Sequence, residues 1–523
     1  MLIDKTYTRN HFKETEQLVK QISSRDIALW ILNQGYFPEQ YVLPPSFQVS
    51  NFQLNPEPYH KKLDRLKRKQ LINISYPKTA LTSRTFGIQH PKIYHDIVFN
   101  IEKNWNHIVE HLFHKDNKVH SYSFPISLTK DRKQHISKLR SGRMIYEWLA
   151  MAERDLVLDA KQYQFIVRTD ITNFYPSVYT HSIPWALHGR ENAVKNPDLY
   201  GNKLDKLIQY ANDGRTNGIP VGSVLSDLIA EIILARVDTE TSKELSKIDF
   251  LAVRFKDDYR FLCNSESDAK HILTKLSNKL SRYNLHINEK KTSIHKLPNG
   301  LYRKHDREYF PHSLKEKEQI SYKCFEHTLL IAIDVHHKYP GTSILEKFIS
   351  ECFIVDKCIR EKRLKIIFSK NTRKKQRQVR QAISLLFFAK RDSEKLLCHV
   401  LSVTEQLCID SRYFDNKLRQ YVKDTIKDEI RRSASKDSVF EIVWLIFFSR
   451  HLRLGINKNE INSLIANLKS KDNYFCKCVM NSKQEFFKDT QDMGVALFQS
   501  PRKLAKENPN FTLARYLDVF ERN

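Results

Sequence analysis

Two patterns of apolar positions divide the chain near residue 320. Before it, short β-rich runs alternate with turns and helices, as at 164–170, 250–263 and 284–288. After it, apolar residues recur every three or four positions with few glycines or prolines, which indicates amphipathic helices. The pattern therefore predicts an α+β fold, in which a mixed N-terminal part is followed by an all-helical C-terminal part.

One helix start in the C-terminal part is marked by polar residues. Ser438 and Glu441 have the Ser-x-x-Glu spacing of a capping box, in which each side chain binds the backbone N–H of the other residue. The run that follows, 443–448, is apolar on all sides of a helix. We therefore expect this helix to lie at the centre of a helical core.

In the N-terminal part, acidic residues stand at the ends of predicted strands. Residues 164–170 place Asp170 at the end of a buried strand, and 250–263 forms two strands whose tight turn carries Asp257 and Asp258. If these strands are neighbours, the three carboxylates meet. Clustered carboxylates need a cation, and Mg²⁺ or Mn²⁺ prefers oxygen ligands. We therefore expect two metal ions here, which activate a hydroxyl for attack on an α-phosphate.

Charge and length narrow the range of partners. The 523 residues include 87 Lys and Arg against 60 Asp and Glu, a formal net charge of +27, which favours a polyanion such as nucleic acid. Two basic runs, 60–70 and 370–380, either form solvated helix faces or line a nucleic-acid path. A chain of this length is expected to form two or three domains.

Membrane, secretory and disulfide-rich classes do not fit the sequence. No run approaches the roughly 18 apolar residues of a membrane helix, and the first residues lack the apolar core of a secretory signal. The eight cysteines are scattered without a CxxC pair, which favours reduced thiols over disulfides or structural zinc. We expect a cytoplasmic protein with no membrane partner.

Four segments resemble motifs A to D of reverse transcriptases and follow the family's order: TDITNFYPSVYTHS, NGIPVGSVLSDLIAEIIL, RFKDDYRFL and LHINEKKT. The resemblance implies a fingers and palm core in which Asp170, Asp257 and Asp258 are the catalytic metal ligands. It also implies that Tyr175 excludes ribonucleotides. The nucleotide-binding residues that it implies are Tyr175, Pro220, Gly222, Ser223 and Lys291.

Several of these residues also have an ordinary structural explanation. Tyr175 fits a core aromatic, Gly222 a turn glycine, and Lys291 a solvated face. For the triphosphate, Arg140 and Arg143 are candidates, although a surface role fits them as well.

Two residues depart from the motifs. Val221 stands where many template-copying reverse transcriptases have glutamine, and Lys256 stands where an uncharged residue is usual. Either departure would alter how a template or primer lies near the site.

The wording of motif A and the long helical part are similar to the abortive-infection (Abi) polymerases and related defence-associated reverse transcriptases of bacteria, above all those of P2-type prophages. This resemblance implies 1–120 as N-terminal part and fingers, 121–315 as palm, and 320–523 as a HEAT-like helical-repeat domain. It implies a homo-oligomer in the bacterial cytoplasm that acts in phage defence and answers a phage-encoded trigger. It further implies polymerisation of dNTPs without a template, with the single-stranded DNA product attached covalently to a tyrosine.

Other readings stay open at this point. The chain would also fit a template-dependent reverse transcriptase of the retron or group II intron type, or a non-catalytic nucleic-acid-binding scaffold. A phenol can replace a 3′-hydroxyl as nucleophile. The 23 tyrosines, including Tyr7, Tyr36 and Tyr41, do not reveal which one would prime.

Overall fold

The computed structural model describes residues 6–63, 71–79, 82–128, 136, 147–352, 364–410, 415–508 and 511–517. The candidate arginines Arg140 and Arg143 and residues 64–70 of the first basic run lie outside these ranges. Within them, no helix combines the length and the apolar character needed to cross a bilayer.

A five-stranded sheet carries the motif strands, in the order β3-β5-β6-β4-β7. The strands are β3 (Val119–Ser121), β4 (Phe165–Asp170), β5 (Phe250–Phe255), β6 (Asp258–Cys263) and β7 (Ser293–Lys296). β3 is parallel to β5, and the other neighbours are antiparallel. The expected strand ending at Asp170 and the expected hairpin at 250–263 are thereby confirmed, because β4 lies directly beside β6.

The two faces of this sheet are covered differently. Side chains of α11 (Val224–Glu244) and α12 (Glu266–Ser281) pack on one face. The other face forms a small separate core with the segment η2 (Ala150–Asp155), α6 (Leu156–Asp159) and η3 (Ala160–Gln162), in which Met151 and Leu156 meet Ile166 and Leu262. Because side chains alternate along a strand, each face receives every second residue.

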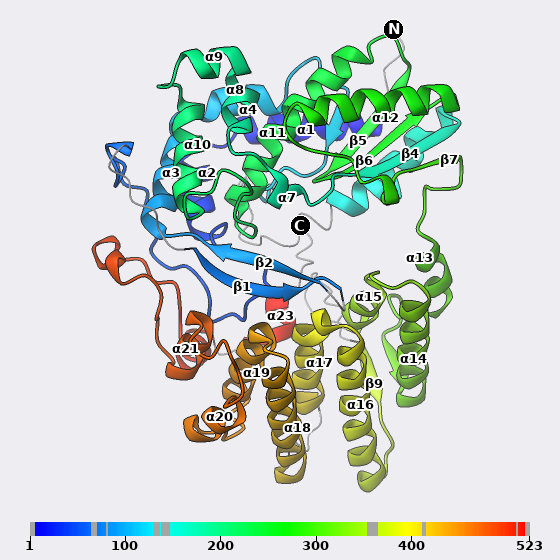
Figure 1. The fold of residues 1–523 in the computed structure, drawn as a ribbon. Helices are drawn as coiled ribbons and strands as arrows, with labels where there is room; N and C mark the ends of the chain where they lie inside the picture. Colours follow the sequence, from blue (N-terminus) through cyan, green and yellow to red (C-terminus); the bar gives the residue numbers. More distant parts are fainter. Residues whose placement is uncertain are drawn as a thin grey trace.

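The remaining N-terminal elements are helices and a separate two-stranded hairpin, and many of these helices lie to the left of the sheet in Figure 1. The hairpin consists of the antiparallel strands β1 (Ile72–Pro77) and β2 (Ser83–Ile88). The helices are α1 (Tyr7–Lys20), α2 (Ser24–Asn33), α3 (Pro91–Lys103), α4 (Trp105–Leu112), α7 (Phe174–Ser177), α8 (Ser182–His188), α9 (Arg190–Lys195) and α10 (Tyr200–Ala211).

Residues 284–288, expected as a strand, do not form one. Only Ile287 makes an isolated bridge, with Ile171. The segment runs antiparallel to the chain just past the end of β4: the N–H of Thr172 donates to His286 O at 2.8 Å, and that of Asn288 donates to Asp170 O at 2.7 Å. The short turn η4 (Glu289–Lys291) follows and brings Lys291 to the same strand end.

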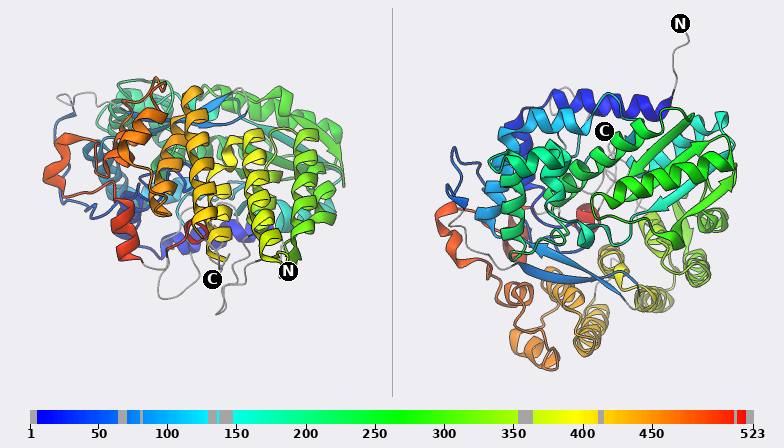
Figure 2. Two further views of the ribbon diagram at one scale, coloured as in Figure 1. Left: turned by 90° about the horizontal axis from the view of Figure 1, so that it is seen from below. Right: turned by 45° about the horizontal axis from the view of Figure 1, so that its top comes forward.

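The C-terminal part is predominantly helical, as the apolar periodicity predicts. Its elements are α13 (Lys304–Tyr309), η5 (Phe310–His312), β8 (Gln319–Ser321), α14 (Tyr322–Lys338), α15 (Ile344–Glu351), β9 (Lys365–Ile367), α16 (Thr372–Asp392), η6 (Glu394–Leu396), α17 (Leu397–Asp410), α18 (Asn416–Ser435), α19 (Val439–His451), α20 (Lys458–Leu464), α21 (Tyr474–Asn481), η7 (Lys488–Met493), α22 (Pro501–Glu507) and α23 (Leu513–Leu517). Figures 1 and 2 show α14 to α19 standing side by side, with the hairpin β1–β2 between them and the sheet.

The start of α19 corrects one prediction. Ser438 is its N-cap residue, but its side chain makes no capping hydrogen bond. Glu441 turns inward, accepts a hydrogen bond from Ser433 Oγ at 2.7 Å and pairs with the buried Lys390. A buried ammonium without carboxylate partners would destabilise the protein strongly. The N–H groups at the helix start can instead bind water, so the loss of a side-chain cap costs less. The central position of α19 is confirmed, since residues 439–449 are all buried.

The hairpin β1–β2 joins the helical part to the rest of the molecule. The rings of Tyr76 and Phe440 meet edge to face at 4.9 Å between centroids, and Asn473 Nδ2 donates to Asn73 O at 3.3 Å. On the opposite side, the N–H of Gly87 donates to Val221 O at 2.9 Å. The hairpin is therefore in contact with both the C-terminal helices and the segment that resembles motif B.

Candidate active site

The three predicted aspartates meet at one end of the sheet. Asp170, the last residue of β4, is the direct cross-strand partner of Asp258, the first residue of β6. Asp257 lies in the turn between β5 and β6, and its carbonyl accepts the N–H of Ile171 at 3.1 Å. The antiparallel pairing of β4 with β6 therefore brings together residues that are far apart in the sequence.

The turn that carries Asp257 has a strained backbone. Lys256 has a φ of +52°, in the left-handed region that costs a non-glycine residue roughly 1–2 kcal/mol. Two buried groups hold it there: Ser123 Oγ accepts the N–H of Lys256 at 2.7 Å, and Arg254 Nη1 donates to its carbonyl at 3.1 Å. The position of the two aspartates therefore depends on side chains behind the turn.

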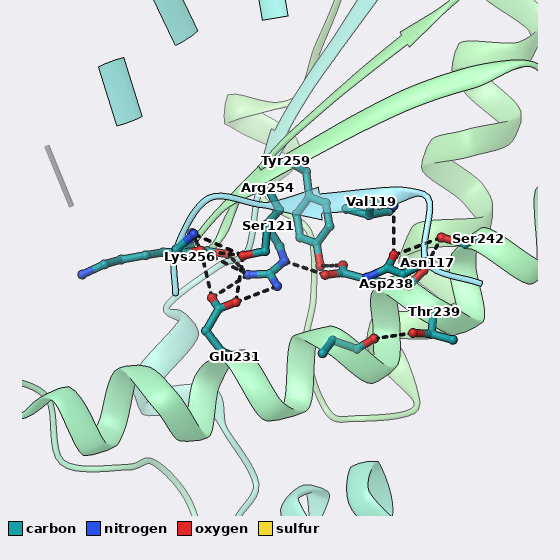
Figure 3. A network of polar contacts seen from close by, with 12 residues as sticks. Asn117, Val119, Ser121, Glu231, Asp238, Thr239, Ser242, Arg254, Lys256 and Tyr259 are labelled. Atoms are coloured by element: carbon teal, nitrogen blue, oxygen red, sulfur yellow. Dashed lines mark hydrogen bonds and ion pairs between the residues drawn. The ribbon is translucent and has the colours of Figure 1, made fainter. Parts of the chain in front are cut away.

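Arg254 is the centre of a buried polar network on the α11 side of the sheet (Figure 3). Its guanidinium donates to Glu231 Oε1 and Oε2 at 2.8 and 3.0 Å and to Asp238 Oδ2 at 2.8 Å. Tyr259 donates its hydroxyl to Asp238 Oδ1 at 2.8 Å, and the hydroxyls of Ser121 and Ser123 donate to Glu231. We call these residues the rear network.

The charges of the rear network shift the pKa of its members. Burial is the main reason that the pKa of Asp238 is raised to about 6, although Arg254 opposes that shift. Burial alone would lower the pKa of Arg254, but Asp238 and Glu231 outweigh it and raise that pKa well above its usual value. Arg254 therefore stays charged and fixes both carboxylates.

The surroundings raise the pKa of two of the carboxyls at the sheet end, those of Asp257 and Asp258. Burial is the main cause of the raised pKa of Asp257 and of Asp258, and the nearby Asp170 raises both further. Asp170 itself forms an ion pair through Oδ2 with Lys291, whereas its buried Oδ1 has no hydrogen-bond partner. Neutralisation by a cation would lower both raised pKa values.

These carboxylates are suitable donors for Mg²⁺ or Mn²⁺, which take oxygen ligands. The buried Oδ1 of Asp170, which has no hydrogen-bond partner among the described residues, is suited to bind a cation. However, within the described ranges no group of three acidic, histidine or cysteine residues already has the spacing of a metal site. The Lys291 ammonium takes one of the oxygens. A cation that binds Asp170 through Oδ2 would therefore have to displace the Lys291 ammonium from that oxygen.

Pro220, Gly222 and Ser223 shape the turn into α11. Gly222 has a φ of +127°, and a Cβ at this position would lie 2.9 Å from Cδ1 of Phe86, so β2 packs directly on the turn. Ser223 is the N-cap of α11, and its Oγ accepts the N–H of Ser226 at 3.4 Å. Pro220 is buried, and its carbonyl accepts the Ser226 hydroxyl. In this geometry Pro220 and Ser223 hold the turn together and point into the protein.

Tyr175 lies in α7, half-buried beside the same turn. Its hydroxyl donates to Asp227 Oδ1 at 2.5 Å, and its carbonyl accepts the N–H of Ile219 at 3.1 Å. Burial is the main cause of its strongly raised pKa, and Asp227 and Asp257 raise it further. The hydroxyl is therefore a permanent donor close to the carboxylates.

Three arginines lie beside Asp258 on the opposite face from the rear network, and we call them the front cluster: Arg168, Arg260 and Arg303. Arg168 and Arg260 are cross-strand partners. Arg260 and Arg303 both lie over the Trp148 ring, at 5.4 and 3.9 Å from its centroid. Arg260 is 1% exposed, yet its Nε and Nη1 have no hydrogen-bond partner among the described residues.

Burial also lowers the pKa of Arg260, to about 10, so the guanidinium remains charged at neutral pH. Arg168 and Arg303 lower that pKa further, and Asp258 opposes them. Like charges opposite each other on neighbouring strands destabilise a sheet, and an unpaired buried N–H costs more. The like charges of Arg168 and Arg260 and the unpaired N–H groups of Arg260 therefore lower the free energy of unfolding.

Several of these residues escaped the sequence interpretation, notably Asp227, Arg254 and Arg260. Each is a charged residue in an otherwise apolar run, which is an available signal for a buried partner. The departure at Lys256 was visible in the sequence. Its ammonium lies 3.7 Å from Asp227 Oδ2 and 3.8 Å from Glu39 Oε1, so acidic partners accompany it.

The region that contains the site is similar to a known protein family. Residues 113–325, less than half of the chain, match the family described as reverse transcriptase (RNA-dependent DNA polymerase). No curated protein sequence matches the chain significantly.

Among solved structures, apo telomerase of Candida tropicalis truncated from its C-terminal domain is 14% identical, with a TM-score of 0.29. That match covers 48% of this chain and 52% of the telomerase chain. A second apo telomerase of Candida tropicalis is 11% identical over 86% of this chain and 72% of its own, with a TM-score of 0.31. At such TM-scores the likeness supports no conclusion. The family match covers the residues that form the site, so the region 113–325 is similar to the nucleotidyltransferases of the reverse-transcriptase family.

Proposed function

We propose that this protein is a DNA polymerase of the abortive-infection type, which polymerises dNTPs in bacterial phage defence and attaches the DNA to one of its own tyrosines. The observation that carries the polymerase assignment is the cross-strand pair Asp170–Asp258 with Asp257 in the adjoining turn. Asp170, Asp257 and Asp258 would hold Mg²⁺ or Mn²⁺. Bound there, the metal would lower the pKa of an attacking hydroxyl and neutralise charge on the phosphates.

The other parts of the site support nucleotide selection and strand binding. Tyr175 would exclude a ribose 2′-hydroxyl, and its hydrogen bond to Asp227 supports this role. Lys291, whose side chain is 65% exposed, would supply a positive charge for the leaving pyrophosphate. Arg168 and Arg303 of the front cluster are half-buried, and their positive charges suit a phosphate of a nucleic-acid strand. Most of the second basic run, 370–380, forms the exposed start of α16, which suits the same partner.

Template-independent synthesis is the finer part of the proposal. Its support is the direct packing of β2 on the motif B turn at Gly222, together with Val221 in place of the usual glutamine. The hairpin is also pinned to the C-terminal helices through Tyr76 and Phe440. This arrangement favours an enzyme that passes no template strand between hairpin and turn. The HEAT-like nature of residues 320–523, the domain limits, the homo-oligomer, the phage trigger and the cytoplasmic location belong to the same proposal.

Protein priming requires an accessible tyrosine. Tyr36 is a poor candidate because it is 1% exposed and donates its hydroxyl to Gln89 O at 2.5 Å. Tyr7, by contrast, is 46% exposed, and Tyr41 is half-buried. The hydroxyl of a priming tyrosine must reach the metal site to act as the nucleophile, so the exposed tyrosines are the first to test.

The test is incubation of the purified protein with each labelled dNTP and Mg²⁺, without template or primer. Label that stays with the protein on a denaturing gel and is released by protease would establish protein-primed synthesis. Asp257→Asn is the matched control and should incorporate nothing. Incorporation only after addition of an RNA template and primer would instead show an RNA-dependent DNA polymerase, the activity that the matched family's description states. Mass spectrometry of the labelled peptide would identify the tyrosine.

A further inference from the structure

The predicted gate, Tyr175, is held at both ends. Its backbone carbonyl accepts the N–H of Ile219 at 3.1 Å, and its hydroxyl donates to Asp227 Oδ1 at 2.5 Å. Residue 227 lies in the first turn of α11, 52 positions further along the chain. The ring is therefore fixed between two elements that the sequence does not place together.

The same carboxylate faces the turn that carries the catalytic aspartates. Asp227 Oδ2 lies 3.7 Å from Lys256 Nζ, and that ammonium lies 3.8 Å from Glu39 Oε1. Lys256 immediately precedes Asp257 in the turn. Asp227 thus lies between the Tyr175 hydroxyl and a positive charge.

An aromatic gate discriminates only if its ring cannot rotate away from the sugar. The ring of a half-buried tyrosine can rotate between staggered χ1 rotamers unless a contact at its hydroxyl end restrains it. A hydrogen bond to an ionised carboxylate is shorter and stronger than one between neutral groups, so it provides such a restraint. Rejection of a larger substrate then follows from a clash that the ring cannot relieve.

We propose that Asp227 is a specificity-determining positioning residue, whose carboxylate holds the Tyr175 ring where it excludes ribonucleotides. The Lys256 ammonium orients that carboxylate from its other oxygen, which explains why an acidic residue and a basic residue occur together at this point of the site. This inference rests on the proposed polymerase function and on Tyr175 as its gate.

The experiment compares incorporation of dATP and ATP by the full chain and by Tyr175→Phe, Asp227→Ala and the double variant. Each single change should lower the dATP-over-ATP ratio of kcat/KM about tenfold, which corresponds to about 1.4 kcal/mol. The double variant should lose no more than either single one, because both remove the same restraint. Asp227→Asn, which retains an acceptor oxygen, should keep more of the ratio than Asp227→Ala.

Tyr309→Phe is the matched control, since that buried hydroxyl also donates to a carboxylate, Glu351 at 2.9 Å, in the helical part. Its ratio should equal that of the unaltered protein. A fall in kcat for dATP and ATP alike, with an unchanged ratio in Asp227→Ala, would reduce Asp227 to a structural role and overturn the proposal. Losses that add in the double variant would also overturn it.

Binding without turnover separates this proposal from the polymerase assignment. Calorimetric titration of dATP and ATP in Ca²⁺ should show the preference in the unaltered protein and its loss in Asp227→Ala, even if no product forms. Preferential dATP binding without incorporation under any condition would reject the proposed function alone. Equal preference in the protein and in Asp227→Ala would reject the role of Asp227 alone.

Discussion

The two faces of the sheet treat arginine in opposite ways. On the rear face, the guanidinium of Arg254 has partners in Glu231, Asp238 and the Lys256 carbonyl. On the front face, Arg260 is equally buried but leaves Nε and Nη1 without partners. The difference teaches that burial alone does not reveal a role. A buried charge with partners stabilises a geometry, whereas a buried charge without them lowers the stability of the fold.

The largest effect is expected from breaking the rear network with Arg254→Met. Removal of the guanidinium leaves Glu231 and Asp238 buried without their counter-charge, so the free energy of unfolding should fall by about 3–5 kcal/mol. The Lys256 carbonyl loses a donor at the same time, so incorporation should fall even where the variant remains folded. Urea unfolding and the incorporation assay measure the two losses. A stability close to that of the unaltered protein would contradict the structural role assigned to this network.

The same substitution on the front face, Arg260→Met, should behave differently. It removes unpaired N–H groups from the interior, so the free energy of unfolding should stay within about 1 kcal/mol of the unaltered protein or rise. Incorporation should fall less than in Arg254→Met, because Arg254 and not Arg260 holds the Lys256 carbonyl. Urea unfolding and the incorporation assay measure both quantities. If stability and incorporation fall as far as in Arg254→Met, the contrast between the two faces is wrong.

A pH series sharpens the description of the rear network. Asp238 has a pKa of about 6 in the folded protein because burial outweighs Arg254, whereas an unfolded aspartate titrates near 3.9. Between these values the folded state binds more protons, so the contribution of Asp238 to stability falls as pH rises from about 4 to about 6. The stability difference between the protein and Asp238→Asn should therefore change across this window and be flat above it. Urea midpoints at several pH values measure it.

The smallest effect concerns the salt dependence of strand binding. Arg303→Gln removes one positive charge of the front cluster. It should therefore reduce the slope of log K against log salt by about 0.7, the value for one phosphate of a single strand. Arg282→Gln changes an exposed arginine at the C-cap of α12; it is the control and should leave the slope unchanged. Equal slopes in all three proteins would place the strand elsewhere.

The sequence alone determined which residues stand at strand ends and in turns. The run before Asp170 and the hairpin at 250–263 were predictable because alternation and turn chemistry are local properties. The order of the four motifs likewise pointed to the reverse-transcriptase family without any coordinates.

Only the tertiary structure decided how charged residues are paired. The hydrogen bond from Tyr175 to Asp227 and the partners of Arg254 depend on contacts between separate elements. The same is true of Glu441, which binds Lys390 instead of capping its own helix. The physical reason is that the energy of a charge depends on its burial and on its neighbours in space, and the sequence pattern contains neither.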